Sequence, residues 1–172
     1  MTVDGDLLPT HQASIDCPIL SWPAGRLRRA MAMRIAFSML GFAALMIGGL
    51  IFVIGPVMTG ELFAALLRLV VQDTPPLTGL DGPNVDSELR FYAVLWMAYG
   101  GTALWVARAI TERMRLLRLM LLIFWFGGVG RLVSYFAVGA PHPLFILLMW
   151  IEIALPLVLL GLSYRRDAAA SS

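Results

Sequence analysis

The sequence has no lysine, one cysteine and two histidines among its 172 residues. Cys17 has no second cysteine with which to form a disulfide within the chain and no histidine close by with which to hold a metal. No cluster of histidines and no pair of aspartates at metal spacing occurs elsewhere, so we expect no metal and no cofactor. The sequence also lacks a serine, histidine and acid set suited to nucleophilic catalysis, which makes an enzyme the less favoured class.

Charge is scarce as well, at 14% of residues, and every basic residue is an arginine. The formal net charge is only +2. Because recognition of a nucleic-acid backbone requires a continuous basic face, we expect no nucleic-acid partner.

Apolar residues, in contrast, make up 59% of the chain, more than a soluble domain of this size could bury. A helix needs about 20 apolar residues to cross about 30 Å of hydrocarbon, and four stretches meet this length. The sequence therefore predicts an all-α membrane protein, a four-helix bundle with spans at about 31–58, 88–110, 115–138 and 142–164.

The segments outside the predicted spans are short or polar. We expect a disordered N-terminal extension over 1–30 and a short C-terminal tail over 165–172. Residues 61–72 are helical in propensity but too short to cross, which predicts an interfacial helix between the first two spans. A proline- and glycine-rich loop follows, and Asp86 or Ser87 is the expected N-cap of the second span.

The arginines beside the spans predict the orientation of the bundle. With four crossings, three arginine groups fall on one side: Arg26, Arg28, Arg29, Arg34, Arg108, Arg113, Arg115, Arg118, Arg165 and Arg166. The opposite side carries five acidic residues against Arg68 and Arg90, namely Glu61, Asp73, Asp81, Asp86 and Glu88. We therefore expect a multi-pass membrane protein with both chain ends in the cytoplasm.

Two charged residues lie inside predicted spans, where insertion of each costs about 2.5–3.5 kcal/mol. Arg131 lies about 10 Å from the outer end of the third span, and Glu152 lies about 15 Å into the fourth. The link between these spans is so short that they form an antiparallel hairpin, in which the two depths differ by roughly one helical turn. An arginine side chain can bridge that distance, so the sequence predicts a buried ion pair.

A polar stripe on the second span could face this pair. Glu88, Tyr92, Trp96 and Tyr99 recur at spacings of four, four and three, which places them on one helix face. Ser134 extends the polar patch beside Arg131. We therefore predict a polar pocket in the outer half of the bundle, lined by the second, third and fourth spans.

Three interpretations of the charged pair stay open. Arg131 and Glu152 could lock the hairpin in register, since polar contacts often hold membrane helices together. They could instead form a site for a ligand, a proton or a lipid headgroup, or they could point outward to the interface. The glycines Gly127, Gly128 and Gly130 indicate tight helix packing beside the arginine, and His142 between two prolines indicates a turn.

From about Met33 to Tyr164 the chain resembles the bacterial family catalogued as domain of unknown function 4345. The resemblance rests on the run N-x-x-S-E-L-R-F-Y, which includes Asn84, Ser87 and Arg90, on Gly127-Gly128-x-Gly130-Arg131, on Pro141-His142-Pro143, and on Glu152 with Pro156. It implies a small four-helix membrane protein and carries no assigned activity.

The residues support three hypotheses about function. The first is a non-enzymatic membrane protein that binds a small amphiphile, a partner membrane protein or a second copy of itself, with membrane lipid around it. The second is a small proton-linked transporter or permease that uses Arg131 and Glu152. The third is a membrane enzyme that acts on a lipid or quinone.

Overall fold

The computed structural model describes residues 24–72 and 74–168, and the regular structure in these ranges is helical. The four helices are α1 (Ala24–Arg68), α2 (Pro83–Arg108), α3 (Met114–Val138) and α4 (Pro143–Ala168). The predicted all-α fold is therefore confirmed.

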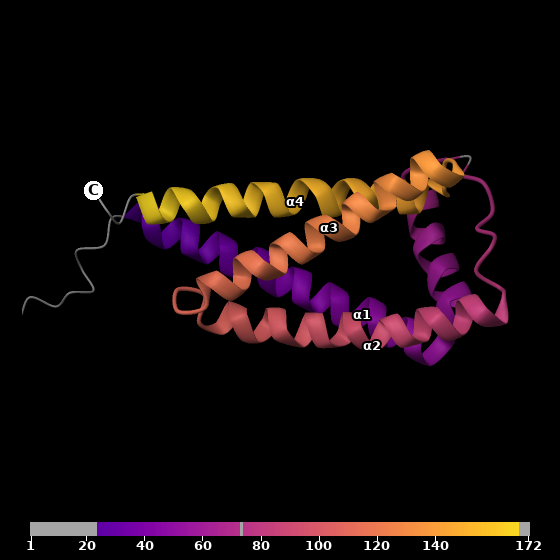
Figure 1. Cartoon of the computed structure of the whole chain (residues 1–172), viewed down its shortest axis with the longest axis horizontal. Helices are drawn as coiled ribbons and strands as arrows, with labels where there is room; N and C mark the ends of the chain where they lie inside the picture. The colour runs from indigo at the N-terminus through magenta and orange to yellow at the C-terminus, as the bar shows by residue number, and fades with distance from the viewer. Residues whose placement is uncertain (1–23, 73, 169–172) are drawn as a thin grey trace, which may run out of the picture.

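The helices form two antiparallel pairs, α1 with α2 and α3 with α4, and contacts between the pairs are fewer. In Figure 1, α3 lies near α2 at their shared turn and diverges from it toward the other end, where it joins α4. The bundle is therefore closed at the end that holds the α2–α3 turn and spread at the end that holds the α3–α4 turn.

Glycines allow α1 and α2 to pack backbone against backbone. A Cβ atom on Gly41 would lie 2.9 Å from the carbonyl oxygen of Gly100, and one on Gly100 would lie 2.6 Å from that of Gly41. A Cβ atom on Gly48 would lie 2.8 Å from the carbonyl oxygen of Ala93. Small residues at such crossings are typical of membrane helices.

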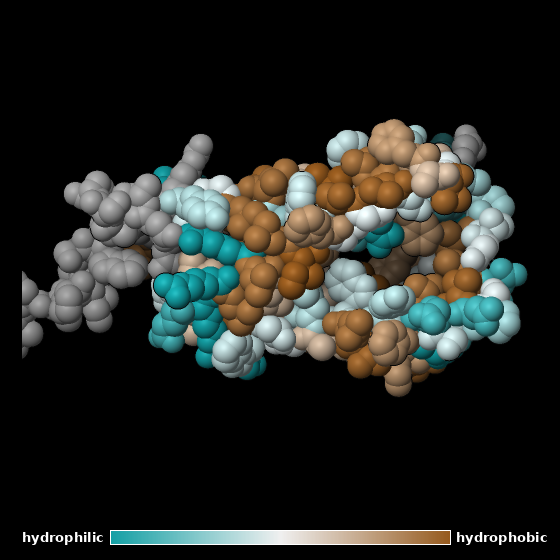
Figure 2. All heavy atoms as spheres, viewed as in Figure 1, coloured by the Kyte–Doolittle hydropathy of each residue, from teal (hydrophilic) through white to brown (hydrophobic). Residues whose placement is uncertain are grey.

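The apolar core lies at the closed end of the bundle. Phe37 from α1, Val106 from α2, Leu117 and Leu121 from α3, and Leu159 from α4 are buried there. Exposed arginines surround the same end, among them Arg28, Arg29, Arg108 and Arg115, and Figure 2 shows hydrophilic side chains gathered there. These four arginines, which belong to the groups that the sequence placed on one side, thus lie at one end of the molecule.

Among the described helices, three are long and apolar enough to cross a membrane, with spans at Leu27–Arg68, Met114–Val138 and Pro143–Tyr164. They indicate a membrane protein. The helix α2 has 26 residues, enough length to cross, but its tryptophans, tyrosines, glycines and arginines lower its hydropathy. Length and hydropathy together therefore support three of the four predicted spans.

Several predicted boundaries were wrong. The helix α1 begins at Ala24, so residues 24–30 are helical rather than disordered, while the rest of the predicted extension lies outside the described residues. The helix α4 continues to Ala168, into the predicted C-terminal tail. The helix α2 begins at Pro83 after Gly82, and neither Asp86 nor Ser87 caps it, because proline at the first helical position already has the required φ and lacks an unsatisfied N–H.

The expected short helix between the first two spans is the last part of α1, residues 56–68, which a bend separates from the rest of the helix. The chain bends at Gly55, whose φ of 87° and ψ of 165° are not helical, and residues 56–68 run across the spread end of the bundle (Figure 1). Glycine tolerates this positive φ, and the residue before a proline avoids the helical region. The pair Gly55-Pro56 therefore determines the bend.

The bend leaves a main-chain acceptor that α2 satisfies. Pro56 has no N–H to donate to the carbonyl oxygen of Phe52, four residues earlier. Nη1 of Arg90 donates to this oxygen at 2.6 Å. Asp86 holds the guanidinium in place through Nε, at 2.8 Å, and Nη2, at 3.3 Å. We call Arg90, Asp86 and the Phe52 carbonyl the bend clamp.

The loop after α1 is joined to the α3–α4 turn. Nε2 of His142 donates to the carbonyl oxygen of Pro75 at 2.9 Å, while its Nδ1 accepts the N–H of Leu144 at 3.1 Å. His142 therefore accepts a hydrogen bond from the first turn of α4 and also links the two pairs of helices across the spread end.

The bend clamp yields a stability prediction. Arg90→Ala removes the donor to the Phe52 carbonyl and leaves Asp86 without its partner, so we expect the free energy of unfolding to fall. The measurement is denaturant or thermal unfolding in mild detergent. The matched control is Arg68→Ala, which removes an exposed 3.8 Å ion pair with Glu61 and should cost about 0–1 kcal/mol. Equal losses in the two variants would contradict the clamp.

Candidate functional site

The two charged residues predicted to meet do so. Nε of Arg131 on α3 donates to Oε2 of Glu152 on α4 at 2.8 Å. The Glu152 side chain is 6% exposed and the Arg131 side chain 35% exposed. Cζ of Arg131 also lies 5.8 Å from the centre of the Phe145 ring. The carboxylate is thus buried between α3 and α4, while the guanidinium reaches outward from it.

A glycine allows α3 and α4 to lie close together beside this ion pair. A Cβ atom on Gly128 would lie 2.8 Å from Cγ1 of Ile153 and 3.1 Å from the main-chain carbon of Glu152. The absence of a side chain on Gly128 therefore lets α4 approach α3 at the level of Glu152. Gly130 faces open space, because nothing lies within 4 Å of a Cβ atom placed there.

Beside the ion pair lies a cavity of about 830 Å³ between α2 and α3. Its lining is mostly apolar and aromatic, and consists of Leu89, Tyr92, Leu95, Trp96, Tyr99, Ile123, Phe124, Gly127, Gly130, Arg131, Ser134 and Glu152. Figure 2, viewed with the long axis of the bundle horizontal, shows the hollow open toward the viewer. The cavity therefore opens through the side of the bundle.

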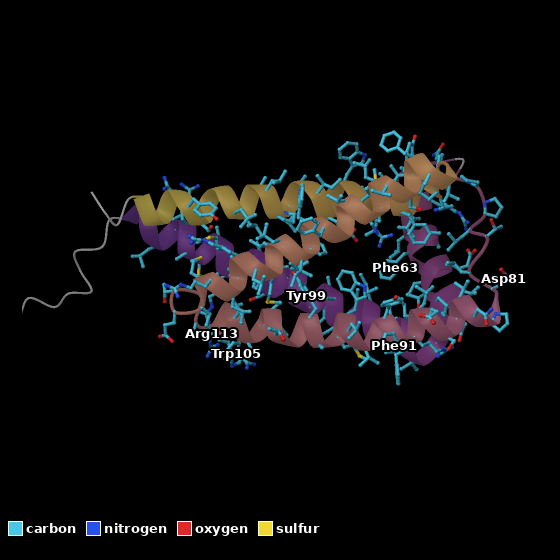
Figure 3. The ribbon with its side chains drawn as sticks, in the orientation of Figure 1. Phe63, Asp81, Phe91, Tyr99, Trp105 and Arg113 are labelled. Atoms are coloured by element: carbon cyan, nitrogen blue, oxygen red, sulfur yellow. The ribbon has the colours of Figure 1, made fainter. Side chains whose placement is uncertain are left out.

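Aromatic rings form the end of the cavity nearest the core. The rings of Tyr99 and Phe124 are stacked, with centres 6.2 Å apart, and Trp96 meets both edge to face. The Tyr99 hydroxyl donates to the carbonyl oxygen of Met120 at 3.0 Å, which ties α2 to α3. Figure 3 shows Tyr99 in the angle between these helices. The rings thus separate the cavity from the core.

Six predicted pocket residues line this one cavity: Arg131, Glu152, Tyr92, Trp96, Tyr99 and Ser134. Glu88 does not, which corrects its assignment. It shares the helix face of Tyr92 but lies one turn nearer the start of α2, where its side chain is exposed and a carboxylate stays hydrated.

The other motif residues have different surroundings. Asn84 and Ser87 are exposed in the first turns of α2, and Arg90 belongs to the bend clamp rather than to the cavity. Gly127 lines the cavity, where a Cβ atom would lie 3.8 Å from Oε2 of Glu152.

Sequence reasoning missed the apolar half of the lining, Leu89, Leu95, Ile123 and Phe124. One signal was present, since Phe124 precedes Arg131 by seven residues and therefore shares its helix face. Leu89 and Leu95 carry the same kind of signal, since Leu89 precedes Trp96 by seven residues and Leu95 precedes Tyr99 by four.

At the closed end, the guanidinium of Arg113 lies 3.4 Å from the ring centre of Trp105 and donates to its carbonyl oxygen, as the labelled side chains in Figure 3 show. This contact belongs to the α2–α3 turn. No group of three or more metal-ligating side chains occurs within residues 24–72 and 74–168.

By its fold and its cavity, the chain is an all-helical membrane protein with a cavity large enough for a small molecule in one half of its bundle. More particularly, the chain belongs to the family of the domain of unknown function DUF4345, whose model matches residues 32–163. No match to the chain is found among curated proteins or among solved structures.

Gly128 and Gly130, both close to Arg131 in sequence, allow a matched pair of substitutions. Gly128→Ala forces α3 and α4 apart, so we expect it to lower the free energy of unfolding by about 1–3 kcal/mol. Gly130→Ala adds its methyl group to open space and removes backbone freedom in a helix, so we expect no loss and a gain of up to about 1 kcal/mol. Unfolding in mild detergent measures both. A larger loss in Gly130→Ala would contradict the packing described above.

Proposed function

We propose that the chain is a non-enzymatic protein of the bacterial inner membrane that crosses the bilayer four times, with both ends in the cytoplasm, and holds a small amphiphile in its lateral cavity. The observation that carries this proposal is the outward edge of Arg131. Within the described residues, only Nε of its guanidinium has a hydrogen-bond partner, so Nη1 and Nη2 remain for a ligand at the cavity wall.

The form of the cavity supports an amphiphile as the ligand. Its volume of about 830 Å³ falls in the range of small-molecule sites, roughly 300–1,000 Å³. Apolar and aromatic side chains suit an apolar body, and a few polar groups suit a head. Because the opening faces sideways, an amphiphile dissolved in the bilayer could enter without passing through water.

The four-span topology has separate support. Successive helices run in opposite directions along the long axis of the bundle (Figure 1). Despite its lower hydropathy, α2 packs along α1 through close glycine contacts. The arginine-rich closed end corresponds to the cytoplasmic side by the positive-inside rule, while the acidic residues Glu61, Asp81, Asp86 and Glu88 belong to the spread end.

Cysteine labelling tests the topology. In a chain with Cys17→Ser, Thr78→Cys places a thiol in the exposed loop at the spread end, and Thr111→Cys places one in the exposed α2–α3 turn. We expect a membrane-impermeant maleimide to label Thr78→Cys in intact bacterial spheroplasts and Thr111→Cys only after permeabilisation. Labelling of both thiols from outside would show that α2 does not cross.

Filling the cavity tests the binding. Gly130→Leu places a side chain in the open space beside Arg131, and we expect it to abolish the retention of an amphiphile that the wild-type protein carries. The measurement is native mass spectrometry of protein released gently from membranes.

Gly101→Leu is the matched control, because Gly101 is also an exposed helical glycine with open space before it but does not line the cavity. We expect this variant to retain the amphiphile as the wild type does. A wild-type protein that carries no amphiphile, or equal retention in Gly130→Leu, would overturn the proposed function.

A further inference from the structure

The charges that line the cavity cancel. Arg131 and Glu152 are the only lining residues of an ordinarily charged type, and they pair with each other at 2.8 Å. The carboxylate that neutralises the guanidinium belongs to the protein and is buried. The cavity therefore presents hydrogen-bond donors, the free Nη groups, but no net positive charge.

This arrangement discriminates between an anionic head group and a neutral head group. An anion placed on the Nη groups would also lie near the Glu152 carboxylate, and it would bring one uncompensated negative charge into an apolar cavity. Such a charge has a large desolvation cost that the already neutralised arginine offsets only in part. A neutral carbonyl oxygen would accept the same hydrogen bonds and leave the net charge at zero.

We infer that, if the proposed amphiphile-binding function holds, the ligand is a neutral amphiphile whose head presents a carbonyl oxygen, such as an ester, ketone or amide, to the Nη groups of Arg131. The chain or ring behind that head occupies the apolar space lined by Leu95, Ile123 and Phe124. Glu152 thus acts as a specificity residue, since its negative charge excludes anionic lipids and fatty acids that a lone arginine would attract.

The test compares three probes of one chain length: a stearate brominated at mid-chain, its methyl ester, and the corresponding brominated alkane. Bromine quenches tryptophan fluorescence at short range, and Trp96 lines the cavity. The protein is held in maltoside micelles, which contribute neither carbonyl groups nor charge. Titrations at about pH 9 keep the stearate ionised, because the ordinary carboxyl pKa is about 4. Subtraction of the Trp96→Phe signal removes quenching at the other tryptophans.

For the wild-type protein we expect the ester to bind about tenfold more tightly than either the stearate or the alkane. For Glu152→Gln, which keeps an acceptor for Nε of Arg131 but removes the negative charge, we expect the preference to reverse in favour of the stearate. Glu61→Gln, which alters an ion pair outside the cavity, should leave the wild-type order unchanged. A role of Glu152 in packing alone would not reverse the order.

The outcomes separate the two proposals. Tighter binding of the stearate by the wild type, or of the alkane, would overturn the neutral-carbonyl inference and leave amphiphile binding standing. Absence of any Trp96-dependent quenching by all three probes would overturn both. If Glu152→Gln does not accumulate, the order of the three probes on the wild-type protein still decides the inference.

Discussion

The ion pair between Arg131 and Glu152 is the interaction on which the spread half of the bundle depends. Burial of either charge alone between membrane helices would be costly, so each residue requires the other. Their contact sets the register of α3 against α4 at the level where Gly128 lets the two backbones approach. It also holds Arg131 at the wall of the cavity, with Nε bonded to the protein's own carboxylate.

Two kinds of packing divide the molecule. At the closed end, side chains from all four helices form one buried cluster. At the spread end, the two pairs of helices are joined instead by particular polar contacts, the bend clamp within the first pair and His142 to Pro75 between the pairs. A lateral cavity can persist there because these contacts fix the ends of the helices without filling the space between α2 and α3.

Much of this architecture was predictable because a bilayer imposes simple rules on a sequence. Runs of apolar residues predicted the helices, and the antiparallel hairpin brought Arg131 and Glu152 to similar depths. The spacing of Tyr92, Trp96 and Tyr99 predicted one face of α2, and these side chains line the cavity. The same reasoning placed Glu88 in the cavity, where it is absent, because periodicity gives the direction of a side chain but not where along its axis a helix leaves its neighbour.

Local patterns in the sequence are enough to show that the chain is helical and apolar, that most of the arginines beside its spans belong to one side, and that an arginine and a glutamate lie at similar depths. These properties follow from local propensity and from the cost of charge in hydrocarbon. Three features depend instead on the folded arrangement: α3 diverges from α2, Arg90 satisfies the carbonyl that Pro56 leaves free, and the cavity opens sideways. Those features arise from contacts between residues far apart in the chain, which no local pattern of the sequence specifies.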